Sequence, residues 1–264
     1  MGRVIVITSG KGGVGKTTVT ANLGAALAAL DKKILIIDMD IGLRNLDVVL
    51  GMENRVVYDI VDVLEGKCRL RQALIRDKRL GGLNLLPASQ VKEKSALNEK
   101  QMIELMDELK RLYDYVLLDS PAGIEQGFKN AAAGAEEAII VTMPEVSAVR
   151  DADRVAGLLL SGGLPNPYLV INRMRRSLVR KGDMLDVQDT LDILGLPLLG
   201  VLADDESIVR ATNLGEPVIL HNDGPASRVF RQMARTLEGA EQTAEKSRVR
   251  DAVMRFFGLQ SRIG

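Results

Sequence analysis

Short apolar runs recur along the chain, and longer stretches with apolar residues at helical spacing separate them. The runs are rich in valine, isoleucine and leucine and carry no charge, which is typical of parallel strands buried on both faces. The longer stretches, such as 95–112 and the segment from Pro225 to about Leu237, have the spacing of amphipathic helices. This alternation predicts one α/β domain with a doubly wound, mostly parallel sheet and helices on both faces. Strands are expected at 4–7, 34–37, 83–86, 116–118, 139–142, 168–171 and 198–202, with 218–220 as a candidate edge strand.

A glycine-rich loop lies between the first strand and a helix expected at 19–30. The loop fits the pattern GxxxxGK[ST], whose glycines turn backbone N–H groups toward phosphates at a helix N-terminus. We expect Lys16 to contact the β and γ phosphates of ATP and the hydroxyl of Thr17 to coordinate Mg²⁺. The expected nucleotide-binding residues are Gly10, Lys11, Gly12, Gly13, Val14, Gly15, Lys16, Thr17 and Thr18.

Carboxylates end the strands that are expected beside this loop. Asp38 and Asp40 follow the strand at 34–37, and Asp119 follows the strand at 116–118. Ligands of open α/β sheets lie off the carboxyl ends of the strands, so these groups should face the phosphate site. We predict that Asp38 and Asp119 lie at the magnesium ion and that Asp40 orients the attacking water. The alternative for Asp38 and Asp40 is that they only cap the following helix.

Three other segments near this site carry predictions about recognition and movement. Asn172 follows the strand at 168–171, and its amide offers the donor and acceptor that match an adenine edge. The segment 41–47 contains glycine and mixed polarity, as expected of a switch loop beside the γ-phosphate. The segment 144–154 opens a helix with a dense charged face. A solvated face is the default interpretation of such a run, but its place beside the switch loops also suits a partner surface.

Composition limits the chemistry and the setting of the protein. Hydrophobic residues make up 46% and aromatic residues 3%, so the core must be built mainly from aliphatic side chains. The 35 basic and 35 acidic residues balance, so no specific nucleic acid partner is expected. The single cysteine, Cys68, excludes an internal disulfide and a cysteine-ligated metal cluster within one subunit. No apolar run approaches about 18 residues, so we expect a cytoplasmic protein with peripheral membrane contact at most.

The end of the chain differs in character from the rest. We divide the chain into an ATPase domain at 1–240 and a segment at 241–264, which begins with a polar linker. Residues 246–257 then have the pattern of an amphipathic helix that lies in an anionic membrane interface. The alternative is a last helix packed on the domain. The apolar stripe and the basic residues around it are Val249, Ala252, Val253, Phe256 and Phe257 with Lys246, Arg248, Arg250 and Arg255.

These motifs together resemble the MinD family of septum-site-determining ATPases, within the deviant Walker A proteins of the ParA/MinD type. The resemblance covers nearly the whole chain, and it rests on GKGGVGKTT at 10–18, DMDIGLRNLD at 38–47, LLDSPAG at 117–123, PEVSAVRDADR at 144–154 and the amphipathic tail. It implies a phosphate-loop fold of about seven or eight strands and slow ATP hydrolysis that a partner stimulates. It also implies that Lys11 acts catalytically on the nucleotide of a partner subunit.

The resemblance further implies a homodimer in the ATP-bound state that recruits the division inhibitor MinC. Residues 246–257 would bind the cytoplasmic face of the inner membrane, and MinE, where it is encoded, would stimulate hydrolysis. Partner contacts would involve Glu145, Ser147, Asp151 and Asp153. Two alternatives are a ParA-like DNA-segregation ATPase and a MinD-like regulator of flagellar number. A nitrogenase-type iron protein is excluded, because its bridging cluster needs two cysteines per chain.

Overall fold

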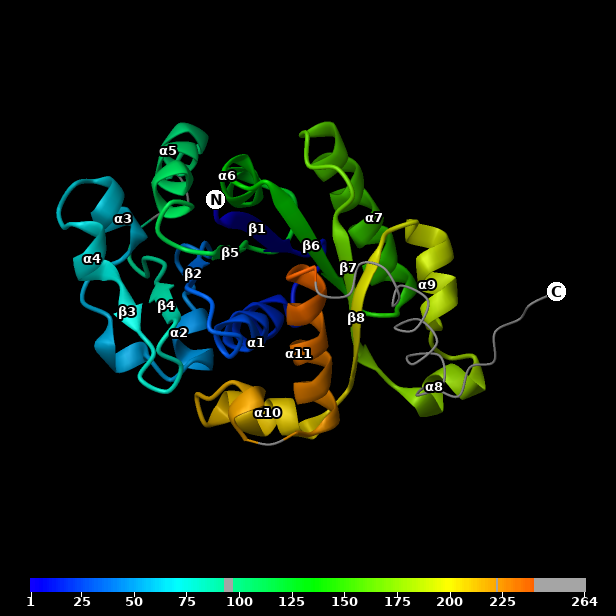
Figure 1. The fold of residues 1–264 in the computed structure, drawn as a ribbon. Coiled ribbons are helices and arrows are strands. Elements are labelled where there is room, and N and C mark those ends of the chain that lie inside the picture. Colours follow the sequence, from blue (N-terminus) through cyan, green and yellow to red (C-terminus); the bar gives the residue numbers. More distant parts are fainter. Residues whose placement is uncertain (93–96, 222, 240–264) are drawn as a thin grey trace.

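The apolar runs of the sequence form one sheet through the middle of the molecule (Figure 1). The structure is a computed structural model that describes residues 1–92, 97–221 and 223–239. The predicted domain division at residue 240 and the predicted tail helix at 246–257 lie outside the described residues. Among the described residues the sheet has eight strands: β1 (Arg3–Thr8), β2 (Ile34–Asp38), β3 (Ile75–Arg76), β4 (Leu83–Leu86), β5 (Tyr115–Asp119), β6 (Glu137–Thr142), β7 (Tyr168–Met174) and β8 (Leu198–Ala203).

The order of the strands places β5 between β1 and β2. The full order is β3-β4-β2-β5-β1-β6-β7-β8, and neighbouring strands are parallel except for the pair β3 and β4. Asp38 pairs in register with Asp119, and Asp119 pairs with Ile7 on its other side. The carboxyl ends of β2, β5 and β1 therefore meet at one edge. The predicted doubly wound, mostly parallel sheet is confirmed.

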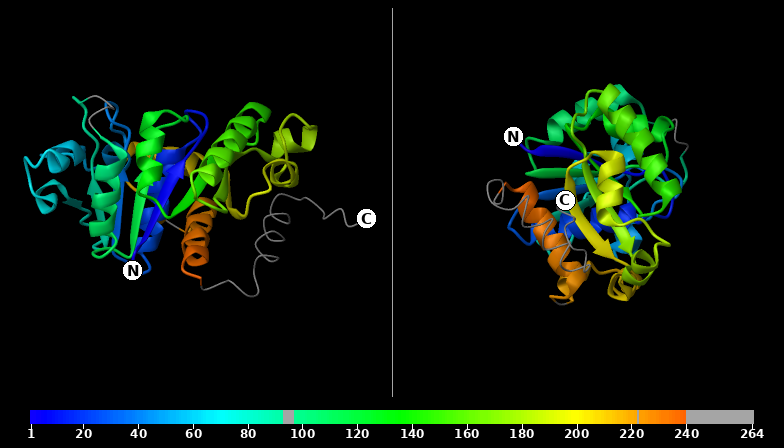
Figure 2. Two further views of the ribbon diagram at one scale, coloured as in Figure 1. Left: turned by 90° about the horizontal axis from the view of Figure 1, so that it is seen from above. Right: turned by 90° about the vertical axis from the view of Figure 1, so that its right-hand side faces the viewer.

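Helices cover both faces of the sheet, as the two views of Figure 2 also show. Within the described ranges, no helix combines the length and the apolar character needed to span a bilayer. One face carries α3 (Ile60–Leu64), α4 (Leu70–Ala73), α5 (Glu99–Leu109), α6 (Gln126–Ala133), α7 (Val146–Ser161), α8 (Arg176–Lys181) and α9 (Val187–Leu194). The other face carries α1 (Lys16–Ala28), α2 (Leu46–Val49), α10 (Glu206–Asn213), α11 (Pro225–Leu237) and the 3-10 turn η3 (Val218–Leu220), while a second such turn, η1 (Glu53–Arg55), follows α2.

Alternate residues of the central strands point into two separate hydrophobic cores. In β1, Val4 and Val6 pack under α5, α6 and α7, while Ile5 and Ile7 pack against α1 and α11. All four side chains are fully buried. Both faces of the strand thus require apolar residues, which is why the strand is a continuous apolar run in the sequence.

The candidate edge strand at 218–220 is wrong, because these residues form η3. Pro217 precedes the turn with φ −59° and has no N–H to donate to a neighbouring strand. The N–H of Val218 instead donates to Oδ1 of Asn22 on α1 over 2.7 Å. The edge strands of the described sheet are instead β3 and β8, and β3 has only two residues, too few to produce a periodic pattern.

The other differences concern where helices begin and end. The helix after the phosphate loop occupies Lys16–Ala28 instead of 19–30, so its first turn lies inside the motif. The helix expected over 95–112 begins at Glu99, where Asn98 caps it through the N–H of Gln101. The sequence pattern did not predict α6, α8 or α9.

Candidate nucleotide-binding site

The glycine loop leaves β1 and ends where α1 begins, with Gly15 as the N-cap residue. Gly13 and Gly15 have φ values of 80° and 93°, which only glycine adopts without strain. A Cβ added at Gly12 or Gly13 would meet no described atom within 4 Å, so the space beside these two glycines is open. As the N-cap residue, Gly15 has no side chain that could cap the first N–H groups of α1. This is the arrangement that receives a phosphate at a helix N-terminus.

Lys16 is buried and points toward the carboxylate that ends β5. Its Nζ lies 3.2 Å from Oδ1 of Asp119, and the two side chains are 8% and 1% exposed. The hydroxyl of Thr20, one turn further along α1, lies 3.1 Å from the same oxygen. Sequence reasoning missed Thr20, although its spacing of four residues from Lys16 places both on one face of the helix.

Asp38 holds the loop that follows β2. Its Oδ1 accepts the N–H of Asp40 over 2.9 Å, and its Oδ2 accepts the N–H groups of Asn45 and Leu46, each over 3.0 Å. Burial and the nearby charge of Asp119 raise the pKa of Asp38 to about 7, against the lowering effect of those three hydrogen bonds. Through these hydrogen bonds Asp38 stabilises the predicted switch loop. From the sequence we expected a contact with the metal ion.

Asp38 and Asp119 fit a magnesium site only if a bound nucleotide supplies phosphate oxygens as further ligands. Asp38 and Asp119 are adjacent and buried, and Lys16 is the one cation that contacts either of them among the described residues. Those residues contain no group of three or more His, Cys, Asp or Glu side chains that could hold a metal. Mg²⁺ is usually bound by one or two carboxylates together with substrate phosphates and waters. Thr17, Asp38 and Asp119 fit that pattern, and their roles as ligands stay a prediction.

Asp40 directly precedes the predicted switch loop at 41–47, and its backbone shapes the loop. Its carbonyl oxygen accepts the N–H groups of Leu43 and Arg44 over 3.1 and 3.2 Å. Gly42, with φ 96°, donates its N–H to the oxygen of Ser89 over 2.7 Å, which ties the loop to the residues after β4. The position of Asp40 at the carboxyl end of β2 is compatible with orienting a water, and that role stays a prediction.

Lys11 has a different environment from Lys16, although both belong to the same loop. Its Nζ lies 3.5 Å from Oε2 of Glu145 and 3.3 Å from the hydroxyl of Ser147, and its side chain is 41% exposed. Gly10 lies so close to α7 that an added Cβ would be 2.4 Å from the oxygen of Asp151. The start of α7, which sequence analysis considered as a partner surface, therefore contacts the phosphate loop directly.

Asn172 lies under the loop. Its Nδ2 donates to the oxygen of Val14 over 2.7 Å, and its Oδ1 accepts the N–H of Arg173 over 2.9 Å. A Cβ at Gly15 would lie 2.3 Å from that Nδ2. Asn172 therefore stabilises the phosphate loop through its hydrogen bond to the backbone of Val14. Its contact with an adenine edge stays a prediction.

The open glycine loop, its buried lysine and the two acids at adjacent strand ends define a phosphate-loop nucleotide-binding protein of the α/β class. Residues 2–157 match the AAA domain family. Across nearly its whole length, the chain belongs to the MinD family.

Three relatives illustrate this membership. The septum site-determining protein MinD of Bacillus subtilis is 49% identical, over 99% of this chain and 100% of the relative. The MinC:MinD cell division protein complex of Aquifex aeolicus contains a chain that is 50% identical, with a TM-score of 0.83 over 90% of this chain and 96% of that one. The MinD of Pyrococcus horikoshii complexed with Mg-ADP is 32% identical, with a TM-score of 0.82 over 93% and 99% of the two chains.

Proposed function

We propose that this protein is an ATPase that dimerises on ATP, binds the cytoplasmic face of the inner membrane, recruits MinC and helps to place the division septum. The observation that carries the proposal is the contrast between the two loop lysines. Lys16 is buried at its own phosphate site, while Lys11 is partly exposed on the loop's outer side. The names of the relatives, including a MinC:MinD complex, support the biological role.

At its own site the chain would bind and orient ATP. The N–H groups of the glycine loop and of the first turn of α1 would bind the phosphates, as Lys16 exchanges Asp119 for the β and γ oxygens. Mg²⁺ bound with ATP supplies charge neutralisation at those oxygens. Thr17, Asp38 and Asp119 would hold the ion and its waters, and Asp40 would orient the attacking water.

Lys11 would serve the site of a second copy. Its contacts with Glu145 and Ser147 are long and lie in solvent, where such ion pairs contribute about 0–1 kcal/mol. The side chain can therefore leave them at little cost when a negative phosphate approaches from outside. A lysine supplied in this way acts like an arginine finger, which adds positive charge where the transferring phosphoryl group gains negative charge.

Dimer formation can be tested by light scattering with ATP. Lys11→Ala should bind ATP as a monomer and fail to dimerise, whereas Lys181→Ala, an exposed lysine at the end of α8, should dimerise like the wild type. An ATP-dependent dimer of Lys11→Ala would contradict the role of Lys11 across the interface. MinC should be retained by the wild type in ATP and not in ADP.

The tail would convert dimerisation into membrane binding. Each basic residue near an anionic leaflet contributes about 1 kcal/mol, but ordering each residue into a helix costs roughly 1 kcal/mol or more. One tail is therefore marginal. Two tails on one dimer make the second insertion intramolecular, which can strengthen binding by about 10² to 10⁴.

Sedimentation with anionic liposomes in ATP, in ADP and without nucleotide tests this part. The wild type should sediment in ATP only. Deletion of residues 246–264 should abolish sedimentation and leave ATP binding intact, and Phe256→Asp should do nearly the same. Equal sedimentation of the wild type in ADP, or sedimentation of the truncated protein in ATP at the wild-type level, would refute the switch.

A further inference from the structure

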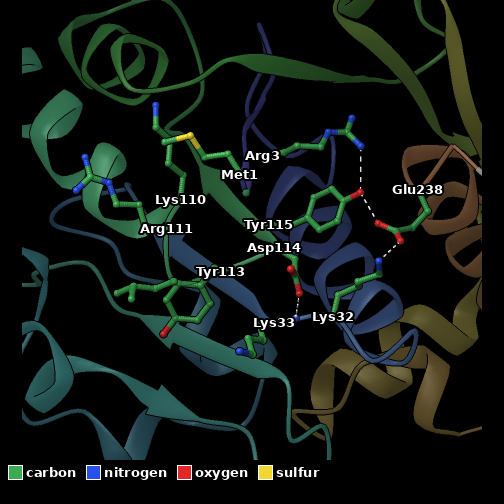
Figure 3. A pocket seen from close by; sticks show the side chains of 12 residues that line it. Met1, Arg3, Lys32, Lys33, Lys110, Arg111, Tyr113, Asp114, Tyr115 and Glu238 are labelled. Carbon is green, nitrogen blue, oxygen red and sulfur yellow. Dashed lines mark hydrogen bonds and ion pairs between the residues drawn. The ribbon is translucent and has the colours of Figure 1, made fainter.

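A second charged region lies at the opposite end of the sheet from the phosphate loop. There, an open hollow of about 620 Å³ lies between the start of β1, the loop before β2 and the loop between α5 and β5 (Figure 3). We call it the basic hollow. Its cationic lining consists of Arg3, Lys32, Lys33, Lys110 and Arg111.

The cations outnumber the acids of the hollow, which are Asp114 and Glu238. Three of these cations are already paired: Lys32 with Glu238, Arg3 with Glu137, and Lys110 with Asp107 and Glu136. The side chains of Lys33 and Arg111 are exposed and make no hydrogen bond or salt bridge with any part of the chain that the structure describes. The positive charge of the hollow that no salt bridge offsets among the described residues is thus that of Lys33 and Arg111, and an anion site requires such charge.

The backbone that carries these cations is held in place by hydrogen bonds. The N–H of Gly2 donates to the oxygen of Lys110 over 2.8 Å, and the N–H of Asp114 donates to the oxygen of Lys33 over 2.8 Å. The carboxylate of Asp114 accepts the N–H of Lys33 in return, also over 2.8 Å. Since hydrogen bonds already hold these segments together, an anion would not have to order them on binding. This lowers the free-energy cost of binding.

The surroundings of the hollow favour a lipid surface over a soluble anion. Two lining residues are apolar and exposed: Leu112 is 54% exposed and Met1 is 88% exposed. Glu238, also in the lining, directly follows the end of α11, and the predicted tail segment comes after it in the sequence. Figure 2 shows the N-terminus and the end of α11 on the same side of the molecule. Cations beside exposed apolar residues are the usual chemistry of a membrane interface.

We propose that the basic hollow binds the phosphate headgroup of an anionic phospholipid and so adds a contact of the folded domain to the contact of the tail. The inference rests on the proposed membrane function, because the tail brings the hollow to the bilayer. The tail alone would then explain only part of the affinity. Lys33 and Arg111 are the residues free to bind the headgroup.

The test is a pair of charge-matched double variants of the full chain. Lys33→Glu with Arg111→Glu changes the hollow, and Lys100→Glu with Lys181→Glu changes two exposed lysines on α5 and α8 by the same total charge. Sedimentation in ATP is measured against vesicles of phosphatidylcholine with increasing phosphatidylglycerol. Each lost cation should weaken binding about fivefold, so the hollow variant, which loses two, should bind at least about 25-fold more weakly and need correspondingly more anionic lipid. The control should stay within about twofold of the wild type.

The outcomes separate this inference from the proposed function. If the wild type binds and the hollow variant binds like the control, the tail suffices and the hollow assignment is wrong. If the wild type fails to bind in ATP, both proposals are wrong. If vesicle binding is unchanged but inorganic phosphate raises the melting temperature of the ATP-saturated wild type and not of the hollow variant, the hollow takes a soluble phosphate and the lipid assignment is overturned. Equal ATP affinity and melting temperature of the two variants establish that the hollow variant is folded.

Discussion

The two ends of one sheet use charged side chains in opposite ways. At the carboxyl end, Lys16 and Asp119 are 8% and 1% exposed, and Asp38 is buried beside them. At the amino end, the pair of Arg3 and Glu137 is 31% and 30% exposed. Charges away from water interact strongly and are costly to leave without a partner, whereas charges near solvent are screened and contribute little. The carboxyl end should therefore be sensitive to the loss of either charge, whereas the amino end should tolerate change.

The backbone differs between the two ends as well. At the carboxyl end, glycines expose N–H groups that no side chain caps, as at Gly15. At the amino end, the corresponding groups already have partners, such as the N–H of Arg3 with the oxygen of Asp114 over 2.9 Å. Substitutions at the first end should thus alter nucleotide chemistry, and substitutions at the second should alter stability or surface binding.

The largest effect is expected from Lys16→Ala. It leaves the buried carboxylate of Asp119 without its ion-pair partner among the described residues, and truncating a buried charge pair costs about 2–5 kcal/mol. The dissociation constant for ATP, measured by calorimetry, should rise by at least about 10². Lys11→Ala is the matched control in the same loop and should keep its affinity for ATP. An affinity of Lys16→Ala within threefold of the wild type would contradict the assignment.

Asp40→Ala should have the next largest effect, on turnover and not on binding. A lost base or water-positioning residue typically lowers the rate by about 10² or more. The ATP-bound dimer should persist, because the substitution retains the backbone hydrogen bonds of Asp40 to Leu43 and Arg44. Phosphate release in single-turnover experiments measures this step. Asp31→Ala is the control and should hydrolyse ATP like the wild type. If Asp40→Ala also hydrolyses ATP at the wild-type rate, another residue orients the attacking water.

The carboxyl end could be predicted largely from sequence because its signals are local. β1, β2 and β5 are continuous apolar runs that end in the phosphate loop, in Asp38 and in Asp119. The rule that ligands lie off the carboxyl ends of parallel strands then joins these segments. That is why the phosphate loop and the two acids were found together.

Contacts between residues that are far apart in the sequence have no local sequence pattern that predicts them. The approach of Lys11 to Glu145 joins residues 134 positions apart, and the support of Val14 by Asn172 joins residues 158 positions apart. No period or motif encodes either contact. The turn at η3 was missed for a similar reason, since Asn22 on α1 captures the N–H of Val218 that a strand would have used.

At the amino end, Arg3→Ala should lower stability moderately and leave ATP affinity unchanged. Arg3 donates to both carboxylate oxygens of Glu137 over 2.6 Å and to Tyr115 over 3.0 Å. Since the pair is about one-third exposed, we expect a loss of about 1–2 kcal/mol, or roughly 2–4 °C of melting temperature per kcal/mol. Arg235→Ala, an exposed arginine of α11, is the control. Equal melting temperatures of the two variants would show that the ion pair of Arg3 and Glu137 does not contribute to the stability of the fold.

The smallest effect should come from Glu238→Gln, and it should depend on pH. Burial raises the pKa of Glu238, but hydrogen bonds from Lys32 and Tyr115 outweigh it and leave the pKa below its usual value. A carboxylate whose pKa is lower in the folded state adds stability above its unfolded pKa of about 4.3 and loses that contribution as the pH falls.

The wild type should therefore be more stable than Glu238→Gln by up to about 1 kcal/mol at pH 6–7, discounted because the side chain of Glu238 is 21% exposed. The difference should shrink toward zero as the pH falls below about 4. Melting temperatures of both proteins across this range measure it, with Glu216→Gln as a carboxylate control away from the hollow. If the difference in melting temperature stays constant with pH, the negative charge of Glu238 does not contribute to stability, and the side chain acts only through packing and neutral hydrogen bonds.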